Sequence, residues 1–227
     1  MLSGEAHRRR EEDDSILHVE RLVERREYAQ RQVLGTSSIH ASGDDVELIA
    51  AHAGVAPQVR AVTEAAMRGE LDFAASLRAR VALLAGLPES VLADVRSAVR
   101  LTNGAMDLCA ELRARGHVIA LVSGGFDAIV ESIAAAVHAD HFRANTLEII
   151  DGRLTGRVQG AIVDRAAKAA ALEEFAALHG IPLSQTVAVG DGANDLDMME
   201  TAAVGIAFCA KPVVQQQADI ALNTRDL

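Results

Sequence analysis

The chain has 227 residues, of which 50% are hydrophobic and 3% aromatic, and its formal net charge is −10. This length suffices for one large domain, or for a domain with a smaller insert. The negative charge argues against a nucleic-acid partner. The sequence contains neither an apolar run long enough to cross a membrane nor the apolar core of a signal peptide, which favours a cytoplasmic protein without a membrane partner. Cys109 and Cys209 lack the spacing of metal ligands and are predicted to be buried, reduced side chains.

Residues 1–43 show little evidence of packed structure. Residues 1–30 are dense in charges of both signs and are predicted to form a solvated helix or arm without chemistry. Residues 31–43 include two turn-like segments, 35–38 and 41–43. The apolar pair Val33-Leu34 is too short to predict a convincing core strand, so the centre of a sheet built on it is expected to be poorly formed.

The rest of the chain falls into two patterns. Residues 44–100 have helical periodicity without a strand and are expected to form a small bundle of helices, at 46–52, 58–68, 73–84 and 88–99. From residue 101, apolar runs alternate with helical segments, which predicts a parallel sheet covered by helices. The strands are expected at 117–122, 144–150, 154–158, 186–189, 205–208 and 220–222, with a hairpin turn at Asp151-Gly152, and the helices at 104–115, 128–137 and 166–178.

Two segments suggest a site for a phosphate group. Ser123-Gly124-Gly125 follows a predicted strand, where a hydroxyl and successive backbone N–H groups near a helix N-terminus can cradle a phosphate. The alternative is an ordinary Ser-Gly turn. Lys168 lies in an apolar run at a helix start, where its charge can neutralise a phosphoryl group. The alternative there is an exposed helix lysine.

A third segment suggests a metal site. Asp191 and Asp195 follow the buried strand at 186–189, with glycines beside them. Ligands of open parallel sheets bind at the carboxyl ends of strands, and carboxylates there suit Mg²⁺. The alternative is a solvated turn in which an aspartate caps a helix.

Together these segments resemble the haloacid-dehalogenase superfamily, and within it the phosphoserine phosphatases. The resemblance covers residues 44–227. It implies an α/β class fold, with a Rossmann-type parallel core formed by 31–43 and 101–227 and a four-helix cap domain formed by 44–100. Three motifs carry the resemblance: Val122-Ser123-Gly124-Gly125-Phe126, Asp164-Arg165-Ala166-Ala167-Lys168 and Val189-Gly190-Asp191-Gly192-Ala193-Asn194-Asp195. The segments that resemble the cap of the family are 66–73 and 76–80.

The resemblance also implies an activity, which is Mg²⁺-dependent hydrolysis of O-phospho-L-serine in the last step of serine biosynthesis. It implies that Met67 and Phe73 pack around the substrate and that Arg80 pairs with the substrate carboxylate. The remaining implied roles are phosphate binding by Ser123 and Gly124, charge stabilisation by Lys168, Mg²⁺ binding by Asp191 and Asp195, and substrate contact by Asn194 and by Asp44, which replaces a family glutamate.

The first family motif, Asp-x-Asp-x-Thr, is where this sequence departs from the pattern. Spacing to the cap places Gly35 at the aspartyl nucleophile, Ser37 at the general acid/base and Ile39 at the threonine. Two explanations stay open: a natural non-catalytic relative, or a reading-frame change that replaced residues 1–43. Three functional hypotheses also stay open: a phosphoserine hydrolase with impaired turnover, a protein that binds phosphoserine without cleaving it, and an incompletely folded chain. The sequence does not indicate an oligomeric state.

Overall fold

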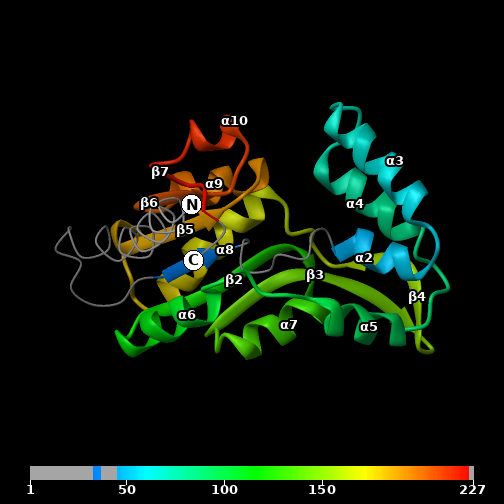
Figure 1. The fold of residues 1–227 in the computed structure, drawn as a ribbon, viewed down its shortest axis with the longest axis horizontal. Coiled ribbons are helices and arrows are strands. Elements are labelled where there is room, and N and C mark those ends of the chain that lie inside the picture. The colour runs from blue at the N-terminus through cyan, green and yellow to red at the C-terminus, as the bar shows by residue number, and fades with distance from the viewer. Residues whose placement is uncertain (1–32, 37–44, 225–227) are drawn as a thin grey trace, which may run out of the picture.

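A computed structural model describes residues 33–36 and 45–224 of the chain. Its centre is a seven-stranded sheet with the strand order β4-β3-β2-β1-β5-β6-β7 (Figure 1). Neighbouring strands are parallel except β3 and β4, which form an antiparallel hairpin. The strands are β1 (Val33–Thr36), β2 (Val118–Phe126), β3 (His141–Ile150), β4 (Arg153–Gln159), β5 (Thr186–Gly190), β6 (Val204–Phe208) and β7 (Ile220–Leu222).

Strand β1 corrects the expectation of a poorly formed sheet centre. It pairs in parallel with β2 on one side and with β5 on the other, so that Gly35 lies level with Ala120 and Ala188. The strand prediction was too weak because it considered side chains alone. A strand between two others is held by backbone hydrogen bonds on both edges, which even a glycine supplies.

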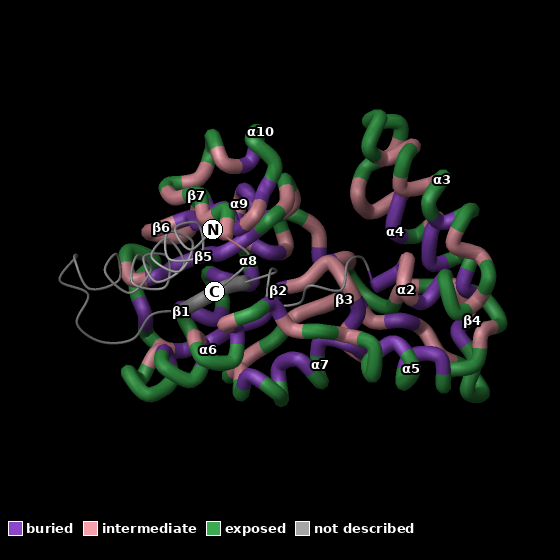
Figure 2. The backbone as a smooth tube through the Cα atoms, in the orientation of Figure 1, coloured by how far each residue is buried: buried purple, intermediate pink, exposed green. Residues whose placement is uncertain are grey.

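Helices cover both faces of the sheet, and the side chains of β2 alternate between them. Ile119 and Leu121 belong to the cluster that includes α6 and α7, whereas Ala120 and Val122 belong to the cluster that includes α8 and α9. In Figure 2 the buried residues follow the central strands and the helix sides that face them. The helices are α2 (Asp45–His52), α3 (Ala56–Met67), α4 (Phe73–Ala82), α5 (Ser90–Ala98), α6 (Ala105–Ala114), α7 (Asp127–Ala136), α8 (Arg165–Leu178), α9 (Leu196–Thr201) and α10 (Pro212–Gln215), with 3-10 turns at Leu183–Gln185 and Ala193–Asp195.

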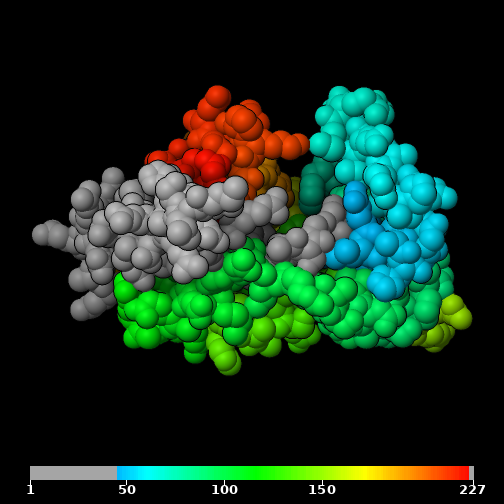
Figure 3. Space-filling view, viewed as in Figure 1, coloured from blue at the N-terminus to red at the C-terminus, as the bar shows by residue number. Residues whose placement is uncertain are grey.

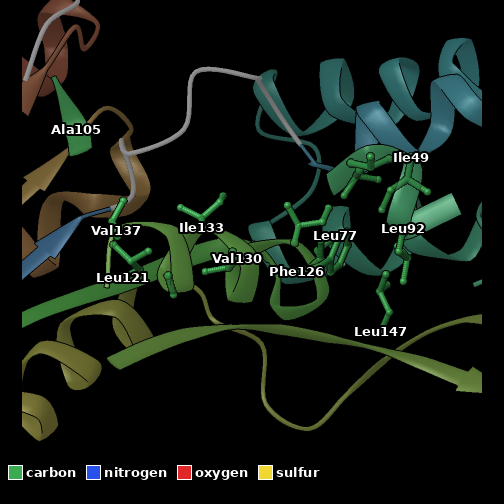
Figure 4. Close-up of a cluster of buried hydrophobic side chains, with 14 of the residues drawn as sticks. Ile49, Leu77, Leu92, Ala105, Leu121, Phe126, Val130, Ile133, Val137 and Leu147 are labelled. Carbon is green, nitrogen blue, oxygen red and sulfur yellow. The ribbon is translucent and has the colours of Figure 1, made fainter. Parts of the chain in front are cut away.

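The four predicted helices of residues 44–100 are present as α2–α5, and three of them share buried contacts with the end of the sheet. Ile49, Leu77 and Leu92 share one buried cluster with Phe126 at the end of β2 (Figure 4). The β3–β4 hairpin joins the same assembly, since Leu154 of β4 exchanges backbone hydrogen bonds with the segment after α4. The helical segment therefore packs against this end of the sheet through α2, α4 and α5.

Smaller predictions had mixed outcomes. The hairpin turn at Asp151-Gly152 is confirmed, with φ angles of 51° and 70°. Cys109 is buried as predicted, but Cys209 is only half-buried, because it lies in a turn with φ of 47° after β6. Among the described residues, helices of the length and apolar character that a membrane span requires do not occur.

Candidate active site

The three segments predicted to bind phosphate and metal meet at one edge of the sheet. Thr36, the last residue of β1, lies level with Leu121 of β2 and with Val189 of β5. Ser123 and Asp191 follow those two residues at a distance of two positions each. The carboxyl ends of three adjacent parallel strands thus face the same crevice, which is where open α/β sheets bind ligands.

Lys168 and Asp195 form a buried ion pair at this edge. The Lys168 Nζ donates to Asp195 Oδ1 at 2.7 Å, and the two side chains are 1% and 0% exposed. Lys168 stands in the first turn of α8 because Asp164 caps that helix, accepting from Ala167 N at 2.9 Å. The alternative of an exposed lysine is therefore wrong. The sequence analysis gave the two residues separate roles and missed their pairing.

The turn after β5 is wrapped closely around Asp195. Asp195 Oδ2 accepts from the backbone N–H groups of Asp191 at 3.2 Å and of Gly192 at 3.0 Å. A Cβ at Gly190 would lie 2.3 Å from Asp195 Cβ, and one at Gly192 would lie 2.2 Å from Asn194 Oδ1. Gly190 therefore has no room for a side chain, and a side chain at Gly192 would require the Asn194 amide to move. The Asn194 side chain is thereby placed over Gly192.

The two predicted metal ligands are used differently. Both Asp195 oxygens already accept hydrogen bonds within the protein, whereas the Asp191 residue is exposed beside the strand end. The described part of the chain contains no group of three His, Cys, Asp or Glu residues that could hold a metal ion. A single carboxylate still fits Mg²⁺, which is commonly held by one or two carboxylates together with waters and substrate phosphate oxygens.

Residues 123–125, which lie within the carboxyl end of β2 and are called the Ser-Gly-Gly loop below, are held from two directions. Ser123 Oγ accepts from Gly125 N at 3.0 Å, and Asn145 Nδ2 of β3 donates to Gly124 O at 2.9 Å. Asp45, the first residue of α2, accepts from Phe126 N at 3.1 Å and is buried. The contacts that Asn145 and Asp45 make with this loop were not predicted, because neither residue lies near the loop in the sequence.

The Asp45 carboxylate fills the space beside the loop. A Cβ at Gly125 would lie 1.9 Å from Asp45 Oδ2, so only glycine fits there. The first residue of the helical segment therefore reaches the backbone of the predicted phosphate loop and places a carboxylate next to it.

Phe73 brings the helical segment to the same loop. A Cβ at Gly124 would lie 2.9 Å from the Phe73 ring, so the ring covers that glycine. Phe73 begins α4 because Asp72 caps the helix, accepting from Ala75 N at 2.6 Å. Arg80 lies two turns further along α4, on the same face, and is buried. Figure 3 shows a hollow between the cyan atoms of α3 and α4 and the orange atoms of the C-terminal half.

Not every predicted site residue joins this arrangement. Met67, the last residue of α3, is 68% exposed. Gly35 contributes its backbone to β1. Ser37, Ile39 and Asp44 lie outside the described residues, so their predicted roles remain predictions.

Comparison with known proteins agrees with this geometry. Residues 21–200 match the family model of haloacid dehalogenase-like hydrolases. A phosphoserine phosphatase of Streptomyces coelicolor is 56% identical over 196 residues, which are 86% of this chain and 48% of that protein. One of Streptococcus thermophilus is 47% identical over 86% of this chain and 91% of that protein. The chain spans about half the length of the relatives from Streptomyces coelicolor and Mycobacterium tuberculosis, at 48% and 47%.

Solved structures give the same result. A phospho-aspartyl intermediate analogue of phosphoserine phosphatase superposes with a TM-score of 0.80 at 41% identity, covering 87% of this chain and 95% of that one. A substrate-bound phosphoserine phosphatase complex superposes with a TM-score of 0.81, also at 41% identity and with the same coverage. The chain belongs to the haloacid dehalogenase-like hydrolases, and within them to the phosphoserine phosphatase family.

Proposed function

We propose that this chain binds O-phospho-L-serine at the sheet edge described above, together with Mg²⁺. One observation carries the proposal: Phe73 of the helical segment covers the Ser-Gly-Gly loop of the sheet. This contact encloses a phosphate-type loop under a helical cover. The names of the relatives support phosphoserine as the ligand.

Each part of the site has a proposed task. The hydroxyl of Ser123 and the backbone at Gly124 hold the phosphate, and Lys168 stabilises its charge. Arg80 pairs with the substrate carboxylate, while Phe73, Met67 and Asn194 contact the rest of the molecule. In this assignment residues 44–100 act as a cap over a core made of 31–43 and 101–227, and Asp44 contacts the substrate.

Asp191 is the residue we propose as the protein ligand of Mg²⁺. The ion, when bound, neutralises negative charge on the phosphate oxygens. We do not assign Asp195 as a second ligand, because coordination would compete with its bonds to Lys168 and to two backbone amides. Its proposed task is to hold Lys168 in place.

Cleavage of the phosphate ester follows substrate binding in this family, and we propose that it is strongly impaired here. Phosphatases of this family attack phosphorus with an aspartate, but residues 21–43 contain no aspartate and Gly35 stands at the expected position. Loss of a nucleophile costs on the order of 10⁴–10⁶ in rate. The alternative is a chain that binds phosphoserine and performs no cleavage at all.

The test combines binding with turnover. Titration calorimetry with phosphoserine and Mg²⁺ should give saturable binding to the unaltered chain, and Ser123→Ala should weaken it. Ser132→Ala is the matched control, because that hydroxyl bonds only to Ile129 O within α7. A folded chain that fails to bind phosphoserine would refute the proposal.

Phosphate release separates the two alternatives. The combined variant Gly35→Asp, Ser37→Asp, Ile39→Thr should raise phosphate release from phosphoserine well above that of the unaltered chain. Residual release that depends on Ser123 indicates an impaired hydrolase, whereas release no faster than in the Ser123→Ala variant indicates a binding protein.

A further inference from the structure

Asn145 connects two parts of the candidate site that are far apart in the sequence. Its side chain is 1% exposed and uses both ends of its amide group. Nδ2 donates to Gly124 O at 2.9 Å, and Oδ1 accepts from Val163 N at 2.8 Å. Val163 directly precedes Asp164, the capping residue of the helix that carries Lys168. One buried amide thus joins the phosphate-type loop to the segment leading into α8.

The amide also fills a break in the sheet. The pairing of β2 with β3 shifts register between Val122 and Phe126, so the loop residues 123–125 have no ladder partner on β3. Asn145, which lies level with Phe126, supplies the missing donor through its side chain. Because this side-chain bond takes the place of a backbone bond, a polar residue is tolerated at a buried position of β3.

The hydrogen bonds continue from Asn145 to Ser123 in one direction. Gly124 O and the N–H of Gly125 belong to the same peptide unit, and that N–H donates to Ser123 Oγ at 3.0 Å. Three amide groups, from the Val163 N–H through Asn145 to the Gly124–Gly125 peptide, therefore point head to tail at one hydroxyl. A hydroxyl that accepts a bond can donate its own proton onward. In such chains each bond strengthens the next by about 10–30%.

We propose that Asn145 is a positioning residue that orients and polarises the Ser123 hydroxyl for donation to a phosphate oxygen. The inference rests on the proposed function, because the acceptor is the phosphate of the ligand. An asparagine is needed because a side-chain amide offers a donor and an acceptor together. Aspartate would keep the bond from Val163 N and lose the bond to Gly124 O, and leucine would lose both.

A double-mutant cycle tests this proposal. The dissociation constants for phosphoserine and for inorganic phosphate are measured for the unaltered chain, Asn145→Ala, Ser123→Ala and the double variant. Each single change should weaken binding about tenfold, as expected for a hydrogen bond to a charged group. The double variant should be weakened about tenfold to twentyfold, since Asn145 acts through Ser123. A double variant weakened about a hundredfold would show independent, merely structural effects and would overturn the proposal.

Two controls complete the experiment. Asn223→Ala removes an exposed asparagine, paired with Gln215 beside β7, and should leave both dissociation constants unchanged. Amide hydrogen exchange at Gly125 and Val163 reports the relay without any ligand, and Asn145→Ala should accelerate both amides more than tenfold. If the unaltered chain binds no phosphoserine, the proposed function fails, whereas unchanged exchange at these two amides refutes the relay itself.

Discussion

Replacing Asp195 by asparagine should destabilise the protein severely. The change leaves Lys168 buried, with an amide in place of the carboxylate that lies 2.7 Å from its Nζ. Removal of one partner from a buried ion pair typically costs about 3–5 kcal/mol. For a chain of this size about 1 kcal/mol corresponds to roughly 2–4 °C in Tm, so Asp195→Asn should lower Tm by about 6–20 °C.

The reverse change should cost less. In Lys168→Met the Asp195 carboxylate keeps the N–H groups of Asp191 and Gly192 as donors, so its charge remains partly compensated. Combining the two substitutions removes both buried charges, and the double variant should melt above Asp195→Asn alone.

Thermal and urea unfolding, followed by circular dichroism, measure both effects. The matched control is Asp197→Asn, since Asp197 also pairs with a residue of α8, Arg165, at 2.5 Å, but both side chains are more than a third exposed. Such a surface pair contributes at most about 1 kcal/mol. A Tm of Asp195→Asn within about 2 °C of that of the Asp197→Asn control would contradict this prediction.

Three further predictions concern single groups. Burial raises the pKa of the Cys109 thiol to about 11 from an ordinary 9.0. The thiol therefore ionises first in the unfolded state, and the free energy of unfolding should fall by about 2–3 kcal/mol between those pH values. Cys109→Ala should remove this pH dependence, and an unchanged pH dependence would contradict the prediction. Burial, aided by the neighbouring His179, lowers the pKa of His141. The unfolded state therefore binds more protons below about pH 6.5, and the free energy of unfolding should decrease as the pH falls below that value. This decrease should be smaller in His141→Phe. Gly125→Ala forces a methyl group against Asp45 and should cost about 1–3 kcal/mol in urea unfolding; a neutral result would show that the loop can shift without penalty.

Periodicity and turn residues were enough to predict most of the architecture. The helices α2–α8, the β3–β4 hairpin and the parallel strands β5–β7 follow from local patterns, because an amphipathic or buried element shows its partner face in its own sequence. β1 could not be judged in this way. Its four residues contain a glycine and a threonine, and its place comes from the two neighbouring strands rather than from its own side chains.

The motifs predicted which segments form the site, but not how its side chains pair. The positions of Lys168 and Asp195 relative to the predicted strands and helices placed both at one edge of the sheet. Their ion pair, however, depends on the turn after β5 folding back on itself. Asn145 and Asp45 act over separations of 21 and 81 positions, through Gly124 O and Phe126 N. Contacts at such separations leave no local pattern, so a single sequence does not reveal them.

The arrangement of the site is consistent with the proposal that substrate binding and cleavage are separable. The Ser-Gly-Gly loop is held by Asn145, the charge pair by the turn after β5, and the cover by Phe73. These contacts are made by residues of other elements, and β1 contributes to the sheet through its backbone pairing with β2 and β5. In the proposed assignment, a glycine at position 35 would lack the carboxylate of the nucleophile, while these supports of the phosphate site would stay in place. Binding of phosphoserine and its cleavage are consequently expected to be separable properties in this chain.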